Sequence, residues 1–171
     1  FEQASELLSI DKETLKAFKK RLEKNNSYLK SEGVDDHFCV GVLVTNRKER
    51  KIFVGHHIKS DHWMGAGGHM EKGESPLQTV IRECQEELNL KVTKANLFDL
   101  THFDDVNRRN CKEHYDFFYN VELGSTPKLI ADKGEFHESG WFTFDEVLKK
   151  KLLPKYRLAL LKIFKEIQEE S

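Results

Sequence analysis

Residues 68–90, GHMEKGESPLQTVIRECQEELNL, carry the strongest structural signal in the chain. The last two-thirds of this stretch predict a helix: Ser75 can cap it, Gln78 completes a capping box, and Pro76 suits the first helical position. At about 100° per residue, the apolar side chains share one face. We expect that face to be buried, and it comprises Leu77, Val80, Ile81, Cys84 and Leu88.

Three carboxylates follow on the same helix, and we expect them on the side opposite the apolar face. Glu83, Glu86 and Glu87 stand at positions i, i+3 and i+4, where neighbouring side chains repel one another. Mg²⁺ and Mn²⁺ prefer oxygen ligands of this kind and would relieve the repulsion. Arg82 could hold one carboxylate by a charge-assisted hydrogen bond. The alternative is a solvated acidic face, which is the common outcome for an isolated cluster.

Hydrophobic periodicity predicts further elements on both sides of this helix. Strands are expected at 38–45, 52–55, 97–103, 115–123 and 141–144, and helices at 11–30, 145–150 and 154–169. The mixture indicates an α/β (α+β) fold, with a mixed sheet flanked by helices. Residues 65–74 are expected to form a glycine-rich loop, and residues 1–36 a helical extension packed on a domain of residues 37–171.

Composition narrows the classes of partner. The net charge of −1 at pH 7 gives no field that would attract nucleic acid, so an anionic substrate requires a local site. Stretches of roughly 20 apolar residues, which a membrane span needs, do not occur. Cys39, Cys84 and Cys111 match neither a disulfide framework nor a zinc spacing, and we expect reduced thiols and a cytoplasmic protein.

The stretch from Gly68 to Leu90 resembles the Nudix box of the Nudix hydrolases, G-x5-E-x7-R-E-U-x-E-E-x-G-U, where U is a bulky aliphatic residue. The matching residues are Gly68, Glu74, Arg82, Glu83, Glu86, Glu87 and Leu90. Two positions depart from the pattern. Cys84 replaces an aliphatic residue and packs as a small apolar group. Asn89 replaces a glycine, and asparagine also tolerates the left-handed conformation.

The resemblance implies a role for each matching residue. Mg²⁺ or Mn²⁺ would be the cofactor, bound by the carbonyl of Gly67 and by the carboxylates of Glu83, Glu86 and Glu87. Arg82 and Glu74 would hold the carboxylates in place. In this family a further acid from a later loop often serves as base or metal ligand. The candidates are Glu135, which we prefer, Glu138 and Asp116. Each could also be an ordinary surface carboxylate.

Other residues suggest sites with weaker support. A zinc site is conceivable among four histidines, although their spacing matches no known pattern: His56, His57, His62 and His69. Trp63 is the best candidate to stack on a nucleobase. Arg108 and Arg109 could meet a phosphate, but a solvated loop is the more frequent arrangement.

The function implied is metal-dependent hydrolysis of a pyrophosphate bond in a nucleoside diphosphate linked to another moiety. Two alternatives remain open. One is a Nudix-fold module that binds a nucleotide without cleaving it, against which the three glutamates argue. The other is action on a non-nucleotide diphosphate, such as an isoprenoid diphosphate.

Overall fold

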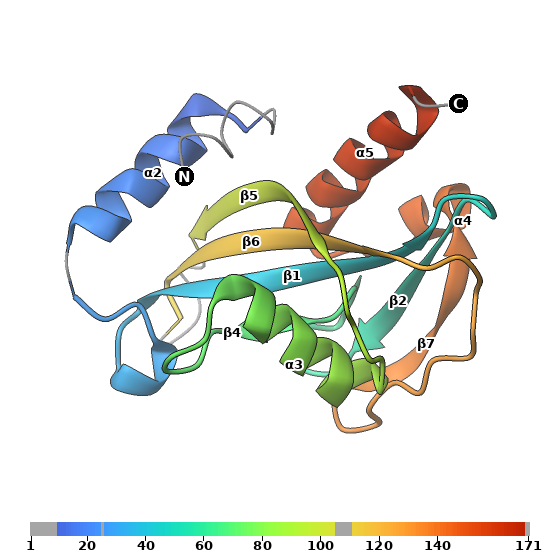
Figure 1. The fold of residues 1–171 in the computed structure, drawn as a ribbon, viewed down its shortest axis with the longest axis horizontal. Coiled ribbons are helices and arrows are strands. Elements are labelled where there is room, and N and C mark those ends of the chain that lie inside the picture. The colour runs from blue at the N-terminus through green and yellow to red at the C-terminus, as the bar shows by residue number, and fades with distance from the viewer. Residues whose placement is uncertain (1–9, 25, 105–110, 170–171) are drawn as a thin grey trace.

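The computed structural model describes residues 10–24, 26–104 and 111–169. The elements of this part of the chain are, in order, α2 (Lys12–Glu23), the 3-10 turn η1 (Lys30–Glu32), β1 (Asp36–Asn46), β2 (Lys51–His57), β3 (His62–Met64), β4 (Gly67–His69), α3 (Pro76–Leu88), β5 (Asn96–Asp104), β6 (Glu113–Glu122), β7 (Phe136–Thr143), α4 (Phe144–Leu148) and α5 (Pro154–Glu169). The expected mixed sheet flanked by helices is confirmed (Figure 1).

Within the described residues, seven strands form one mixed sheet. Its main order is β3-β2-β1-β6-β5, with β4 paired to β1 and β7 paired to β2. Strands β1 and β6 are parallel, and the other pairs are antiparallel. Along its second edge, β1 pairs with β4 at residues 39–41 and with β2 at residues 44–46. The candidate site lies at the gap along this edge of β1 between its pairing with β4 and its pairing with β2.

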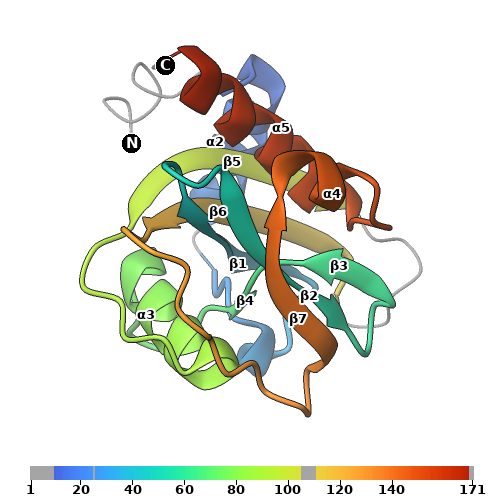
Figure 2. The same cartoon turned by 90° about the vertical axis from the view of Figure 1, so that its right-hand side faces the viewer.

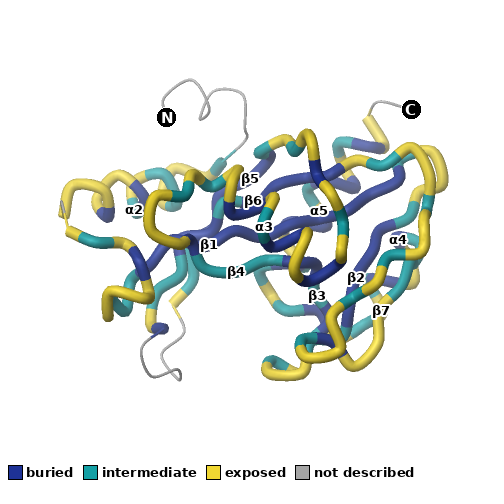
Figure 3. The backbone as a smooth tube through the Cα atoms, turned by 60° about the horizontal axis from the view of Figure 1, so that its bottom comes forward, coloured by how far each residue is buried: buried dark blue, intermediate teal, exposed yellow. Residues whose placement is uncertain are grey.

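Alternation along β1 supplies two separate cores. Leu43 faces α5, where it joins Phe118 and Leu160 in one cluster. Val42 and Val44 face the other side and pack with the apolar residues of α3. Figure 2 shows α5 and α3 on opposite sides of the sheet, and Figure 3 shows that β1 and β6 are buried along most of their length. The sheet is therefore a rigid frame from which both helices are positioned.

Helix α2 packs on the sheet but is shorter than predicted. Phe18 is fully buried and packs edge-on against the ring of Tyr115. The helix ends at Glu23, and not near Lys30, because the buried Arg21 guanidinium donates to the Asn26 side chain and to the Ser27 carbonyl. These bonds hold the chain after α2 in a non-helical path, an interaction that periodicity does not reveal.

The glycine-rich segment, residues 65–74, differs from prediction more clearly, because it contains strand β4 and is not only a loop, and strand β3 comes directly before it. Both strands are three residues long, and β4 begins with two glycines, so neither shows an alternating pattern. Their backbone pairing with β2 and β1 is what makes them strands. Among the described residues, no helix is long and apolar enough to cross a membrane.

Candidate active site

Helix α3 forms as predicted and buries Val80, Cys84 and Leu88 as expected, but the rest of its buried face differs from the prediction. Ser75 and Gln78 make both hydrogen bonds of the capping box, and Asn89 takes the left-handed conformation after the last turn. Leu77 and Ile81 are 40% and 39% exposed, whereas Glu83 and Glu87 are only 7% and 9% exposed. The prediction that these two glutamates point away from the buried face was therefore wrong.

The two glycines of β4 explain how the carboxylates fit under the sheet. A side chain at Gly68 would place its Cβ 2.0 Å from Oε1 of Glu83. The backbone N–H of Gly67 donates to Oε2 of Glu87 at 3.0 Å. Because glycine has no Cβ, β4 can lie directly against α3 with both carboxylates between them. Hydrophobicity alone cannot show this, since it assigns every glutamate to solvent.

Arg82 joins the acidic residues into one network. Its Nε donates to Glu74 at 2.8 Å, and its Nη1 contacts Glu83 at 2.9 Å and Glu86 at 3.1 Å. Nη2 donates to the carbonyl of His69 in β4 at 3.0 Å. The hydrogen bond from Arg82 is the largest cause that lowers the pKa of Glu74 to about 2. Arg82 thus fixes α3 against β4.

The buried carboxylates carry charge that the protein only partly compensates. Burial raises the pKa of Glu87 to about 8, and the nearby charges of Glu83 and Glu135 add to this effect. Burial also raises the pKa of Glu83, although Arg82 opposes the shift. Glu86 differs, since its side chain is 59% exposed. Such an oxygen-rich group with excess negative charge fits a hard divalent cation.

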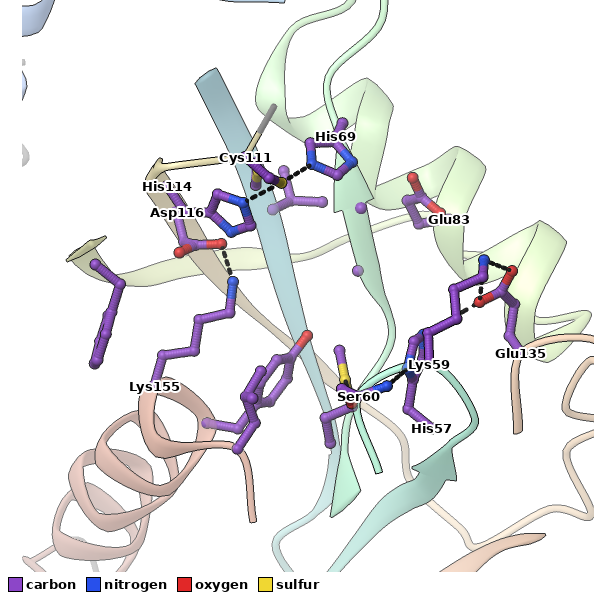
Figure 4. Close-up of a pocket in the computed structure, with 18 of the residues that line it drawn as sticks. His57, Lys59, Ser60, His69, Glu83, Cys111, His114, Asp116, Glu135 and Lys155 are labelled. Atoms are coloured by element: carbon purple, nitrogen blue, oxygen red, sulfur yellow. Dashed lines mark hydrogen bonds and ion pairs between the residues drawn. The ribbon is translucent and has the colours of Figure 1, made fainter. Parts of the chain in front are cut away.

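Glu83 and Glu87 line a cavity of about 530 Å³ that opens between β4, the end of β2 and the start of α5. The opposite wall carries Asp116, whose carboxylate is completely buried and pairs with Nζ of Lys155 at 2.6 Å. Figure 4 shows these groups around the cavity, with Glu83 on one side and Asp116 and Lys155 on the other. The volume suits a ligand of nucleotide size.

The structure separates the three candidates for a further acid. Glu135 lines the cavity and accepts hydrogen bonds from Lys59 Nζ at 2.9 Å and His57 Nε2 at 3.1 Å. Glu138 lies exposed in β7 and does not line the cavity. Asp116 lines it but is held by Lys155. Only Glu135 therefore combines partial exposure with a position facing Glu87.

Two other expectations fail because the side chains concerned pack elsewhere. Trp63 lies in β3, is 9% exposed and stacks against His56 with Lys150 over its ring, so it cannot stack on a nucleobase. Among the four histidines suggested for zinc, only His69 belongs to a group with metal-ligand spacing, and its neighbours are different ones. Arg108 and Arg109 lie outside the described residues.

Sequence reasoning named Asp116 but missed other polar residues that the sheet brings to the cavity or next to it. The parallel pairing of β1 and β6 sets His37 beside His114 and Cys39 beside Asp116. Cys111, just before β6, reaches the same place. The sequence did offer one signal of a site here, which is that polar side chains stand at alternate positions in two otherwise apolar strands. Without the pairing of the strands, however, that signal could not be assigned to one site.

Comparison with known protein families matches residues 35–163 to the NUDIX domain. The chain belongs to the NUDIX domain family. This match confirms the resemblance carried by residues 68–90, and the α3 network described above is its Nudix box.

Individual relatives agree with this assignment. The chain is 33% identical over 91 residues to "Probable DHNTP pyrophosphohydrolase" of Lactococcus lactis subsp. cremoris, covering 50% of this chain and 54% of that protein. It is 32% identical over 76 residues to 8-oxo-dGTP diphosphatase of Proteus vulgaris, covering 42% and 66%. The matches thus span between half and two-thirds of the length of these relatives.

The fold is also found in solved structures of the family. Dihydroneopterin triphosphate pyrophosphohydrolase of E. coli superposes with a TM-score of 0.66 at 14% identity, covering 72% of this chain and 91% of that one. MutT NUDIX hydrolase from Burkholderia pseudomallei gives a TM-score of 0.64 at 21% identity, covering 74% and 96%. At these identities the likeness concerns the fold.

Proposed function

We propose that this NUDIX protein hydrolyses a pyrophosphate bond in a nucleoside diphosphate derivative, with Mg²⁺ or Mn²⁺ as its cofactor. The observation that carries the proposal is the pair of buried carboxylates, Glu83 and Glu87, on the wall of a nucleotide-sized cavity. Burying two like charges costs free energy unless a cation compensates them. Arg82 contacts Glu83, whereas the hydrogen bond that the Glu87 carboxylate accepts comes from the backbone N–H of Gly67.

The metal-holding groups in this proposal are the carboxylates of Glu83, Glu86 and Glu87 and the carbonyl of Gly67. A bound divalent cation supplies an acidified water and neutralises charge that develops on the phosphates. Arg82 and Glu74 act as positioning residues, because their hydrogen bonds set the direction of the Glu83 and Glu86 carboxylates.

Glu135 is proposed as the residue that accepts the proton of the attacking water. It faces the cavity, and the charge on its carboxylate acts on Glu87 across it. His57 and Lys59 hold the carboxylate in place through hydrogen bonds to its two oxygens. Geometry therefore favours Glu135 over Glu138 for this step.

The names of the relatives support a nucleotide-like substrate. Two are called a DHNTP pyrophosphohydrolase and an 8-oxo-dGTP diphosphatase. Among the structural neighbours, one is a NUDIX domain complexed with ADP-ribose and another is an Ap4A hydrolase. These compounds share a phosphoanhydride attached to a nucleoside or a pterin. We propose a small molecule of this class as the partner of the cavity.

A substrate panel tests the proposal directly. Dihydroneopterin triphosphate, 8-oxo-dGTP, ADP-ribose and Ap4A are incubated with Mg²⁺ or Mn²⁺, and phosphate-containing products are separated by chromatography. We expect metal-dependent turnover of at least one compound. Glu83→Gln and Glu87→Gln should each lower turnover on the order of 10²-fold or more. Glu138→Gln is the matched control, since that exposed carboxylate lies outside the cavity.

The panel also separates the alternatives. Tight binding of a nucleotide without turnover at any metal concentration would replace the proposal by a binding module. An isoprenoid diphosphate is added to the panel for the other alternative, and its turnover without release of a phosphate-containing fragment would indicate isomerisation. Undiminished activity in both Glu83→Gln and Glu87→Gln would refute the assigned carboxylates.

A further inference from the structure

Three imidazoles and one thiol converge beside the end of the cavity away from Glu135, where His69, Cys111 and His114 line the cavity and His37 is buried behind them. His37 comes from β1, His69 from β4 and His114 from β6, and Cys111 lies just before β6. One ligand atom from each side chain lies within 4.8 Å of the other three. Figure 4 shows Cys111 between His69 and His114, on the far side of β4 from Glu83. The four residues come from three separate segments, because Cys111 and His114 are three residues apart, and the full set could not be recognised by spacing.

The thiol lies close to all three rings. The Sγ atom of Cys111 is 3.3 Å from Nε2 of His37, 3.6 Å from Nε2 of His69 and 2.8 Å from Nε2 of His114. Tetrahedral Zn²⁺ with a Zn–S bond of about 2.3 Å and Zn–N bonds of about 2.0–2.1 Å requires S···N separations of about 3.6 Å. Two of the three separations are therefore within a few tenths of an ångström of that value. His114 would need to move outward by less than about 1 Å.

The orientation of His37 suits a metal ligand. Its Nδ1 lies 3.1 Å from the carbonyl oxygen of Val34, which can only accept, so Nδ1 carries the proton. In the neutral ring, Nε2 then directs its lone pair at the sulfur of Cys111. A backbone carbonyl that fixes the tautomer in this way is the usual outer contact of a metal-binding histidine.

The chemistry of the four groups distinguishes this cluster from the carboxylates of α3. Thiolate and imidazole are ligands that suit Zn²⁺, whereas Mg²⁺ and Mn²⁺ prefer carboxylate oxygen. We propose that His37, His69, Cys111 and His114 bind a Zn²⁺ ion. Four protein ligands complete the tetrahedron, which is the arrangement of a structural zinc.

A second possible ligand set shares His114 but is less suitable. Cys39, His114 and Asp116 also lie within metal-ligand spacing of one another. The Lys155 ammonium contacts the Asp116 carboxylate at 2.6 Å and already neutralises the negative charge that a metal ion would need. Repulsion from this cation disfavours a metal there. The zinc is therefore assigned to the set that contains Cys111 and not Cys39.

The location gives the zinc a function. His69 is the last residue of β4, and its carbonyl accepts the hydrogen bond from Arg82. One residue earlier, the backbone of Gly68 lies against the Glu83 carboxylate. A zinc ion that ties β4 to β1 and β6 would hold these contacts in register. The site would thus stabilise the strand on which the acidic network rests, without entering the proposed hydrolysis.

Metal content and cobalt spectroscopy test the zinc site on the full chain. Protein dialysed against excess Mg²⁺ is expected to retain about one zinc per chain by mass spectrometry. Replacement by Co²⁺ should produce a thiolate-to-cobalt charge-transfer band in the near ultraviolet. Cys111→Ser should abolish the band and weaken zinc binding about 10-fold or more. Cys39→Ser and Glu87→Gln are the controls, and both should retain zinc and the band.

Two outcomes would overturn the proposal. The first is wild-type protein that binds neither Zn²⁺ nor Co²⁺ through sulfur. The second is a band that survives in Cys111→Ser but disappears in Cys39→Ser. If Cys111→Ser does not fold, alkylation of the wild-type protein decides: zinc should protect Cys111 from iodoacetamide, and equal modification with and without zinc refutes the site.

Discussion

Replacing Glu87 with glutamine should stabilise the metal-free protein, although the same change is expected to destroy activity. Burial raises the pKa of Glu87 from 4.5 to about 8 in the folded protein. Between these two values the unfolded chain releases a proton that the folded chain retains. The free energy of unfolding therefore falls as pH rises above about 4.5, and the fall ends near pH 8.

The size of the effect follows from the two pKa values. A shift from 4.5 to about 8 corresponds to a limit of about 5 kcal/mol. Between pH 5 and pH 7, the contribution of Glu87 changes by about 2.5 kcal/mol. Glutamine does not titrate and can still accept the hydrogen bond from Gly67. The advantage of Glu87→Gln over the wild type should therefore grow with pH by this amount.

Urea denaturation in the presence of a chelator, followed by tryptophan fluorescence at pH 5, 6, 7 and 8, measures the difference. Trp63 is buried and should report unfolding. Adding Mg²⁺ should stabilise the wild type increasingly at higher pH, because a cation favours the ionised carboxylate, and should have little effect on Glu87→Gln. Parallel stability curves for the two proteins from pH 5 to pH 7 would refute the argument that Glu87 is buried without sufficient compensation.

Two further substitutions test the close approach of β4 and the buried ion pair. Gly68→Ala should displace the Glu83 carboxylate, since the added Cβ would lie 2.0 Å from it, and should lower kcat on the order of 10²-fold. Gly124→Ala is the matched control, because its Cβ meets nothing within 4 Å. Equal kcat values for the two variants would contradict the prediction. Lys155→Met should lower the free energy of unfolding, measured by urea denaturation, by about 3–5 kcal/mol, because it leaves the buried Asp116 carboxylate without its ion-pair partner. Adding Asp116→Asn to this variant should restore much of the lost stability. A double variant as unstable as Lys155→Met would contradict this reasoning.

Local sequence signals determined the elements that local forces stabilise. The capping box of α3, the left-handed Asn89 and the near-continuous apolar run of β1 were all readable, because each depends on residues a few positions apart. The Nudix box was readable for the same reason, since one helix and the loop before it hold all of its members. The mixed sheet followed from the number and type of these elements.

Tertiary structure decided which side chains are buried and which segments meet. The Glu83 carboxylate faces inward because Gly68 in β4 leaves room for it, and the Glu87 carboxylate accepts a hydrogen bond from the Gly67 backbone, whereas Leu77 and Ile81 are left exposed. Likewise, His37 and Cys111 lie far apart along the chain and come together through the pairing of β1 with β6. Burial and long-range pairing depend on what covers a surface. That information lies in the packing of distant segments and not in the periodicity of any one of them.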